Sequence, residues 1–324
     1  MITFDINSKG SMKRKILITG GAGFIGSSLA ERLARDPDNY IVIVDNLLTG
    51  SISKVPKSVH QNVKFIKGNA NDLMDIASIF HAYRFDYVFH YAAVVGVKRT
   101  LANPVMVLND ITGINHILSL SKNTGVKRVF FTSSSEVYGE PVEYPQNEYT
   151  TPLNSRLPYA IVKNVGEAYL RSFKREYDLD FTIFRLFNTY GPKQSIDFVI
   201  SKFLAAATKD KDITIYGDGS QTRTFCYIED HLEATTNAFY NNLLVNDVAN
   251  IGTDHEITML DLAKYIIDFT NSSSQIIHLP SLKEGDMSRR KPDVTKMKQL
   301  LQREFTPLNE GLKEILKSSQ FVSS

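Results

Sequence analysis

The chain has 324 residues, is 43% hydrophobic and 22% charged, and carries a formal net charge of +2. These values are typical of a globular enzyme. Because 37 Lys and Arg residues balance 35 Asp and Glu residues, no overall positive charge favours a nucleic-acid partner. No apolar run approaches the roughly 20 residues of a membrane helix, so we expect no membrane partner. The single cysteine, Cys226, excludes an internal disulfide, argues against a zinc site and fits a cytoplasmic location; no metal is expected.

The first half of the chain has the pattern of a parallel sheet with crossover helices. Residues 1–14 lack an apolar stretch typical of a signal peptide and are predicted to form a disordered tail. From residue 15, short β-branched runs that are apolar on both faces alternate with longer amphipathic segments. We expect strands at 16–19, 41–45, 63–66, 87–93, 128–133 and 181–187, and helices at 24–35, 72–83, 104–123 and 157–176. This order predicts a doubly wound α/β (Rossmann) domain over residues 15–190.

After residue 190 the elements become shorter. Helices are predicted near 195–209, 230–242, 258–270 and 308–317, with short strand segments between them. We expect residues 191–324 to form a smaller C-terminal α/β domain, and segments near 225–250 to return to the main sheet.

A glycine-rich segment at residues 20–26, GGAGFIG, follows the first predicted strand and opens the first predicted helix. Gly21, Gly23 and Gly26 have the GxGxxG spacing, in which glycine permits a tight turn and close approach of the backbone to a pyrophosphate. The second strand ends at Asp45, where a carboxylate binds the adenosine ribose and repels a 2′-phosphate. The segment therefore predicts an NAD site. The alternative is an Asp45 that only caps a turn.

Tyr159 and Lys163 are spaced to share one face of a helix. A nearby ammonium group stabilises a phenolate, which lets tyrosine act as a base near neutral pH. With 15 tyrosines in the chain, this spacing is expected about once by chance, so position decides. The pair opens the helix after the strand at 128–133, and Ser134 follows that strand at the carboxyl edge of the sheet.

At these motifs the sequence resembles the extended short-chain dehydrogenase/reductase superfamily, in its branch of nucleotide-sugar epimerases, dehydratases and decarboxylases. The resemblance runs from about residue 15 to about residue 317. It is carried, in order, by TGGAGFIG (19–26), VDN (44–46), HYAA (90–93), SSSEVYG (133–139), Tyr159 with Lys163, FNTYGP (187–192), YGDGSQTRTF (216–225) and RRKPD (289–293).

The resemblance implies a catalytic triad of Ser134, Tyr159 and Lys163. Tyr159 would accept the proton of the sugar 4-OH while hydride leaves C4 for NAD, and Lys163 would hold the nicotinamide ribose. The implied cofactor-binding residues are Gly20, Gly23, Phe24, Ile25, Gly26, Asp45, Asn46, Asn69, Ala70, Ala92, Tyr159 and Lys163.

The downstream motifs resemble the nucleotide-diphosphate grip of the same branch, which makes residues 191–324 a nucleotide-sugar-binding domain for a UDP-sugar. The resemblance places Asn188 on the diphosphate, Tyr216 and Arg223 near the nucleotide, and Arg290 on the diphosphate with Asp293 beside it. The planar guanidinium fork suits phosphate oxygens. An arginine taken singly in a loop is more often a solvated surface residue.

Two segments depart from the pattern of the branch. Gly68-Asn69-Ala70 stands where many relatives have Gly-Asp, and Asn69 can still accept from the adenine amino group through its carbonyl. HYAAVVGVKRT (90–100) and PYAIVK (158–163) replace the segments that we expect in standard UDP-glucuronate decarboxylases. Both border the expected sugar pocket, so the exact substrate stays open.

Glu136, two positions after Ser134, discriminates between reactions in this branch. Ordinary 4-epimerases carry a small or neutral residue there, and 4,6-dehydratases carry this Glu commonly preceded by Asp, where this chain has Ser135. Decarboxylases pair Ser-Glu with the arginine of the GSQTRTF motif, here Arg223. The leading hypothesis is a UDP-glucuronate decarboxylase that forms UDP-xylose; a UDP-sugar 4-epimerase and then a 4,6-dehydratase are the alternatives. Glu136 as a structural carboxylate that caps a turn or pairs with a lysine also stays open.

Two further expectations concern the whole protein. A non-catalytic NAD-sensing or scaffold protein on the same fold is the alternative of a different class, and such a protein need not keep Tyr159 and Lys163. The helices at 104–123 and 157–176 carry more apolar residues than contact with one sheet requires. By resemblance, relatives commonly dimerise through the two helices at these positions. We therefore expect a homodimer, although core packing explains the same residues.

Overall fold

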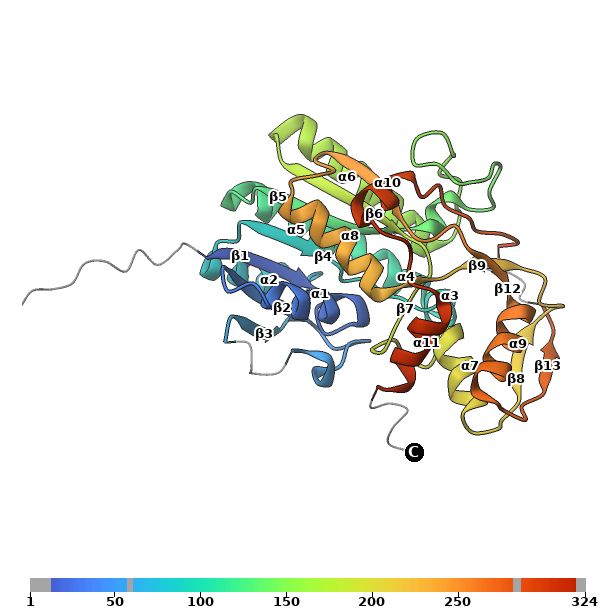
Figure 1. Ribbon diagram of the computed structural model, residues 1–324. Helices are drawn as coiled ribbons and strands as arrows, with labels where there is room; N and C mark the ends of the chain where they lie inside the picture. The colour runs from blue at the N-terminus through green and yellow to red at the C-terminus, as the bar shows by residue number, and fades with distance from the viewer. Residues whose placement is uncertain (1–12, 57–60, 282–286, 319–324) are drawn as a thin grey trace, which may run out of the picture.

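The computed structural model describes residues 13–56, 61–281 and 287–318. Its centre is a seven-stranded parallel sheet with the order β11-β6-β5-β4-β1-β2-β3 (Figure 1). The strands are β1 (Arg14–Thr19), β2 (Asn39–Asp45), β3 (Val63–Lys67), β4 (Tyr87–His90), β5 (Arg128–Ser134), β6 (Asp180–Leu186) and β11 (Asp247–Ile251). From β1 the chain adds β2 and β3 on one side of the sheet and then β4, β5 and β6 on the other. This order confirms the predicted doubly wound fold class. Residues 1–12 of the predicted tail lie outside the described residues.

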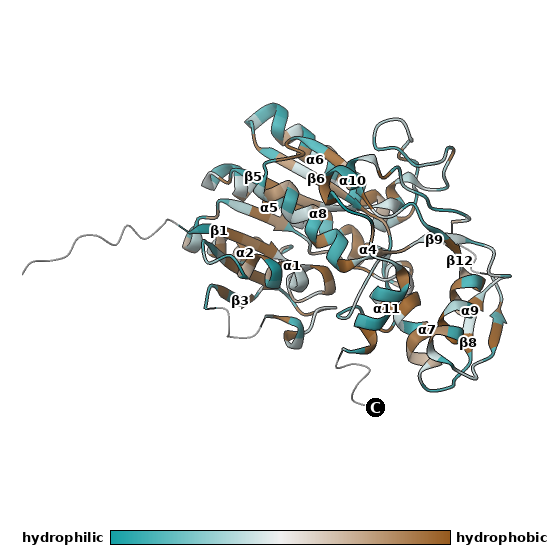
Figure 2. Ribbon diagram, viewed as in Figure 1, coloured by the Kyte–Doolittle hydropathy of each residue, from teal (hydrophilic) through white to brown (hydrophobic). Residues whose placement is uncertain are grey.

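Helices cover both faces of this sheet because its strands are apolar on both faces. In β1, Ile16 and Ile18 face one buried cluster and Leu17 faces the other. The first cluster includes α1 (Phe24–Ala34) and α8 (Ile228–Tyr240), and the second includes α2 (Leu73–Tyr83), α5 (Asp110–Thr124) and α6 (Pro158–Tyr177). In Figure 2 the central strands are largely in hydrophobic colours, and the helices around them alternate between hydrophobic and hydrophilic segments. None of the described helices is long and apolar enough to cross a membrane.

One predicted strand is shorter in the structure and one predicted helix is divided. The strand predicted at 87–93 ends at His90, and residues 91–96 form a loop at the carboxyl edge of the sheet. The helix predicted at 104–123 is split at Asn109 into α4 (Pro104–Leu108) and α5, and α3 (Val97–Ala102) precedes it. The loop at 91–96 meets the start of α5, since the Val94 N–H donates to Asp110 at 2.8 Å.

The C-terminal half adds a smaller α/β layer beside the sheet (Figure 1). Strands β7 (Thr189–Tyr190) and β10 (Cys226–Tyr227) pair, as do β8 (Ile213–Tyr216) with β13 (Ile276–Leu279), and β9 (Thr222–Thr224) with β12 (Glu256–Thr258). The helices of this half are α7 (Val199–Ala207), α8, α9 (Met259–Thr270), α10 (Thr295–Leu301) and α11 (Leu308–Leu316). Helix α8 packs on the Rossmann sheet and β11 belongs to it, so the two halves interleave. The predicted division at residue 190 stays a prediction.

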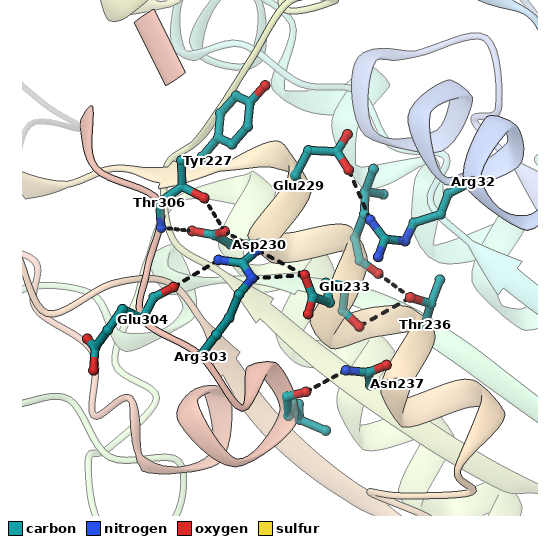
Figure 3. Close-up of polar contacts among 12 residues, drawn as sticks. Arg32, Tyr227, Glu229, Asp230, Glu233, Thr236, Asn237, Arg303, Glu304 and Thr306 are labelled. Carbon is teal, nitrogen blue, oxygen red and sulfur yellow. Dashed lines mark hydrogen bonds and ion pairs between the residues drawn. The ribbon is translucent and has the colours of Figure 1, made fainter. Parts of the chain in front are cut away.

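A buried carboxylate on α8 holds the C-terminal segment against the Rossmann half (Figure 3). Asp230 accepts hydrogen bonds from Arg303 Nη2 at 2.8 Å and from the Thr306 backbone N–H and hydroxyl at 2.8 and 2.6 Å. On the preceding residue, Glu229 pairs with Arg32 of α1 at 2.9 Å. A buried carboxylate needs this number of donors, so α8 is fixed between α1 and residues 303–306.

Candidate active site

The turn between β1 and α1 is a cradle that only glycine can form. Gly20 has φ +70°, and a Cβ at this position would lie 2.6 Å from the backbone nitrogen of Ala92. A Cβ at Gly26 would lie 2.3 Å from the carbonyl oxygen of Gly20. Gly23 precedes α1 and offers no side-chain cap to the first helical N–H groups. The N-terminus of α1, which begins with Phe24 and Ile25, therefore presents backbone donors and a positive helix end to an anion such as a diphosphate.

Asp45 lies at the end of β2 beside this cradle. Its Oδ2 accepts from the Ala22 N–H at 3.0 Å and its Oδ1 from the Leu47 N–H at 2.8 Å. Each oxygen keeps a further lone pair for a ribose hydroxyl. The neighbouring Asn46 closes a turn by accepting from the Leu48 N–H at 2.9 Å. The structure thus brings the predicted ribose-binding carboxylate next to the predicted diphosphate cradle.

The loops after β3 and β4 complete the edge on which the predicted cofactor residues lie. Asn69 Oδ1 accepts from the Asn71 N–H at 3.1 Å, which leaves its second lone pair for a ligand. Ala70 is buried. Ala92 donates its N–H to the Thr19 hydroxyl at 3.3 Å and touches the glycine turn. These residues lie along the carboxyl ends of β1, β3 and β4, where ligands of doubly wound sheets bind.

Ser134, Tyr159 and Lys163 come together at the carboxyl end of β5. Ser134 ends β5, and its hydroxyl accepts from the Glu136 N–H at 3.2 Å. Tyr159 and Lys163 lie on the first turns of α6, with Lys163 Nζ 5.7 Å from the Tyr159 ring centroid and 4.8 Å from that of Phe131. Among the described residues, Lys163 Nζ makes these ring contacts but no hydrogen bond, so a buried ammonium group is left with donors for a bound ligand.

Burial dominates the electrostatics of this group. It lowers the pKa of Lys163 to about 8, against the opposing charge of Asp110. Burial also raises the pKa of Tyr159, and the Glu136 carboxylate raises it further, whereas hydrogen bonding from Ser134 and the charge of Arg290 oppose this rise. A bound ligand that brings positive charge beside Tyr159 would favour its ionised form.

Glu136 forms an ion pair with Arg290, in which Oε1 and Nη2 lie 3.7 Å apart. The Arg290 side chain is only 8% exposed, and its Nε has no hydrogen-bond partner in the described part of the chain. Because both charges also act on Tyr159, the pair belongs to the group of Ser134 and Tyr159. The resemblance placed Arg290 on a diphosphate, and the structure adds this contact with Glu136.

The segment that carries Arg290 is tied down on both sides by Glu256 of β12. Arg289 Nε lies 2.6 Å from Oε1 and Lys291 Nζ lies 3.1 Å from Oε2 of this carboxylate. These partners lower the pKa of Glu256 to about 2, hydrogen bonding from Arg289 being the largest cause. Arg290, between them in the chain, extends toward Glu136 instead.

The other predicted substrate residues are spread over the C-terminal half. Arg223 lies on β9 and is buried, with Nη1 donating to the Thr222 carbonyl at 2.7 Å. Tyr216 ends β8, and the Asn188 carbonyl accepts from the Cys226 N–H at 2.9 Å. Asp293 accepts from the Thr295 N–H at 2.9 Å and from Asn147 Nδ2 at 3.1 Å. These contacts give Asp293 a local structural role, and its place beside a diphosphate stays a prediction.

Sequence reasoning missed three buried polar residues around the site. His90 ends β4 with Nδ1 2.7 Å from the Thr19 hydroxyl, and burial lowers its pKa to about 3, so it is neutral. Glu167 lies one turn after Lys163 on α6, and Asp110 opens α5. The available signal was a charged or polar residue inside an otherwise apolar strand or helix face.

Comparisons with known proteins agree with this geometry. The chain is 36% identical over 321 residues to a UDP-N-acetyl-alpha-D-glucosaminuronate decarboxylase of Bacillus cytotoxicus, covering 94% of this chain and 97% of the relative. It is 34% identical to UDP-glucuronic acid decarboxylase 3 of Arabidopsis thaliana, covering 92% and 86%. The crystal structure of a UDP-glucose 4-epimerase with UDP-glucose from Thermotoga maritima superposes with a TM-score of 0.89 at 32% identity, covering 96% and 100%.

The sequence model of the NAD dependent epimerase/dehydratase family matches residues 16–252. This match confirms the predicted enzyme class and the predicted cofactor, NAD. The glycine cradle, Asp45 and the Lys163 ammonium group, which has no hydrogen-bond partner among the described residues, fit this cofactor. The chain belongs to the NAD-dependent epimerase/dehydratase family.

Proposed function

We propose that this enzyme removes the carboxyl group of a UDP-linked hexuronate, with UDP-glucuronate as the substrate and UDP-xylose as the product. The ion pair between Glu136 and the buried Arg290 carries the proposal. A guanidinium group whose Nε has no partner among the described residues can turn to a substrate carboxylate, and the charges of Glu136 and Arg290 both act on Tyr159. The two decarboxylase relatives, each aligned over more than nine-tenths of this chain, support the same reaction.

The chemistry needs a ketone at C4 of the sugar. NAD, when bound, supplies the acceptor for the C4 hydride. Tyr159 takes the proton of the 4-OH, and Lys163 stabilises the phenolate and binds the ribose. The resulting β-keto acid loses CO₂ because the electrons of the C5–C6 bond pass into the ketone. Arg290 and Glu136 orient the carboxylate before this cleavage, and C5 then takes a proton from water. Return of the hydride to C4 and of the Tyr159 proton to the C4 oxygen would give UDP-xylose and restore NAD.

Two substrates of the same class differ at C2. UDP-glucuronate carries a hydroxyl there and the N-acetylated uronate of the Bacillus relative carries an acetamido group. The C4–C6 chemistry is the same for both, so the second uronate is our second candidate. A 4-epimerase is the third, because the Thermotoga enzyme superposes so well.

Mass spectrometry of reaction products tests the proposal. The purified enzyme is incubated separately with UDP-glucuronate, its 2-acetamido analogue and UDP-glucose. Loss of the mass of CO₂ from either uronate supports decarboxylation and identifies the C2 group. Loss of water from UDP-glucose would instead indicate dehydration, and a new isomer of unchanged mass would indicate epimerisation. Uronates that both remain unaltered would overturn the proposal.

We also propose a homodimer across α5 and α6. Exposed apolar residues lie on α4 and α6, among them Val105, Leu108 and Ile161. A groove lies between α5 and α6, and its lining includes Asn115 and Ser119 of α5 and Val165 and Tyr169 of α6. Light scattering coupled to size exclusion should give twice the chain mass of 36.5 kDa, and Ile161→Glu should give the monomer mass. A monomeric wild type would overturn this assembly.

The cytoplasm is the compartment that we propose. The lone Cys226 is buried, and burial raises the pKa of its thiol well above the usual value. A chain with one buried thiol forms no internal disulfide, and disulfides are the stabilising feature of proteins in oxidising compartments. Cell fractionation with an antibody to this chain tests the location.

A further inference from the structure

Gln146 is a fully buried glutamine that pairs with the segment carrying Arg290. Its backbone N–H donates to the Lys291 carbonyl at 2.7 Å, and its carbonyl accepts from the Asp293 N–H at 2.8 Å. Gln146 therefore lies opposite Pro292 in a short parallel bridge. Its side chain adds a third contact, because Oε1 accepts from the Lys291 N–H at 3.2 Å. These hydrogen bonds hold Gln146 against the residues that directly follow Arg290.

The register places the side chains of Gln146 and Arg290 on one face of this pairing. Successive side chains of an extended segment point to opposite faces, and the two residues that flank Arg290 both reach Glu256. Arg290 and Pro292 therefore share the other face. The side chain of Gln146 lies on that face too, because paired residues of neighbouring strands point to the same side. Gln146 is thus a diagonal neighbour of Arg290, at a spacing that long side chains can bridge.

Each of these two side chains has a buried donor without a partner in the described part of the chain. The donor atoms are Nε2 of Gln146 and Nε of Arg290. The other end of the glutamine amide settles which atom is the nitrogen: the Lys291 N–H is a donor, so the amide atom that faces it is the oxygen. Two donors cannot satisfy each other, and a buried donor left unpaired is costly. The pair of side chains therefore requires an acceptor.

The carboxylate beside Arg290 does not take this place. Glu136 lies 3.7 Å from Nη2 of Arg290, so it is paired with a different nitrogen from Nε. Gln146 is 0% exposed and Arg290 is 6% exposed, and a group that reaches both donors must therefore be small. A water molecule fits this description, and so does a single oxygen of an anionic substrate group that enters from the side of Arg290.

We propose that Gln146 and Arg290 form a two-donor subsite for one oxygen atom, supplied by an ordered water or by the anionic group of the bound sugar nucleotide. An oxygen held by Nε fixes the plane of the guanidinium group and leaves its Nη groups to Glu136 and the substrate. Gln146 is thus a positioning residue for Arg290. The inference rests on the substrate role proposed for Arg290, and it does not depend on which reaction follows oxidation at C4.

Crystal structures of the NAD-bound enzyme without ligand, with UDP and with UDP-glucuronate test the subsite directly. The Tyr159→Phe variant is used, so that the ligand is not consumed. We expect one ordered oxygen within hydrogen-bonding distance of both donors. A water in all three structures identifies water as the source, and a phosphate or carboxylate oxygen in a complex identifies the substrate. Structures in which no oxygen bridges the two donors, or in which Glu136 binds Arg290 Nε, would overturn the proposal.

Calorimetry of UDP and UDP-glucuronate binding in the same background tests the positioning role. Gln146→Met keeps the length of the side chain and removes its polar contacts, and should weaken UDP-glucuronate binding about tenfold. Gln146→Glu keeps the acceptor for Lys291 but offers Arg290 its own oxygen, and its charge repels an anionic ligand, so we expect at least the same loss. Asn147→Ala is the matched control: it removes the Nδ2 bond to Asp293 and loosens the same two segments from the opposite face. Its affinities should stay within about twofold of the background.

A loss shared by UDP and UDP-glucuronate would place the effect on the diphosphate, and a loss confined to UDP-glucuronate would place it on the carboxylate; either supports the positioning role. Equal losses in Gln146→Met and Asn147→Ala would show that Gln146 only anchors the segment, and unchanged affinity in Gln146→Met would also overturn the role. Should Gln146→Met fail to fold, the crystal structures and Gln146→Glu decide. None of these measurements follows product formation, so failure here is distinguishable from failure of the proposed decarboxylation.

Discussion

Arg185 and Glu167 form a buried two-point ion pair below the catalytic residues. Arg185 Nε binds Oε1 at 2.9 Å and Nη2 binds Oε2 at 2.7 Å, and both side chains are at most 3% exposed. The Ser133 hydroxyl also donates to Oε1 at 2.7 Å. Because Glu167 lies one turn after Lys163 on α6 and Ser133 precedes Ser134 on β5, this network fixes the two elements that carry the predicted triad.

Glu167→Gln should strongly destabilise the protein. The substitution leaves the Arg185 charge buried with half of its pairing, and breaking such a pair by removing one partner costs about 3–5 kcal/mol. Urea denaturation followed by circular dichroism measures the loss. Arg171→Gln is the control, since Arg171 is 49% exposed and lies 3.9 Å from the same carboxylate; it should cost less than about 1 kcal/mol. Equal losses in both variants would contradict the assignment.

Tyr159→Phe should abolish turnover and leave NAD binding nearly intact. The substitution removes only the hydroxyl that takes the 4-OH proton, while the ring remains on α6 and Lys163 keeps its place. Product formation by chromatography and NAD affinity by calorimetry check the two halves of this expectation. Retained turnover would refute the role of Tyr159 as the base, and lost NAD binding would show that the ring itself shapes the cofactor site.

Much of the fold was predictable because buried parallel strands have an unusual pattern. The runs at 16–19, 41–45 and 128–133 are apolar on both faces, and each lies within an observed strand. The glycine turn was also predictable, since steric contact at Gly20 and Gly26 leaves glycine as the only residue that fits.

What the sequence could not show is how distant segments meet. The partner of Glu136 proved to be Arg290, 154 positions further along the chain, and no local spacing predicts such a contact. Asp110 looked like part of one helix at 104–123, because propensity does not reveal that its carboxylate binds loops from two other strands.

Glu136→Gln should reduce decarboxylation by at least about a hundredfold, the lower end of the range for a group that manages protons. The amide keeps the size of the side chain but loses the charge that holds Arg290. An enzyme that only epimerises at C4 should tolerate the change. The measurement is therefore the ratio of decarboxylation to 4-epimerisation in the variant and in the wild type. Glu143→Gln is the control, because Glu143 is half-buried like Glu136 but, in the described chain, bonds only to hydroxyl groups of Thr150 and Thr151. Wild-type decarboxylation in Glu136→Gln would contradict the proposed function.

Glu256→Gln should raise KM for the sugar nucleotide by about tenfold and change kcat little. Arg289 donates to both oxygens of Glu256, and Lys291 pairs with Oε2. Losing the Glu256 charge frees the segment that presents Arg290. Weakening two charge-assisted hydrogen bonds costs a free energy that corresponds to about a tenfold change in KM. Steady-state kinetics gives the split between KM and kcat. Glu229→Gln, which breaks the remote pair with Arg32 (Figure 3), should leave both unchanged.

The same variant makes a prediction about pH. The pKa of Glu256 is lowered to about 2 from an ordinary value of 4.5, so its ionised form binds its partners more tightly in the folded state. This stability is present above pH 4.5 and is lost as the pH falls through about 2. The difference in free energy of unfolding between the wild type and Glu256→Gln should therefore be constant between pH 6 and 8 and shrink on acidification below about pH 4.5. Urea denaturation at a series of pH values measures this difference, and a gap that persists unchanged into acid would show that the contacts of Glu256 do not depend on its charge.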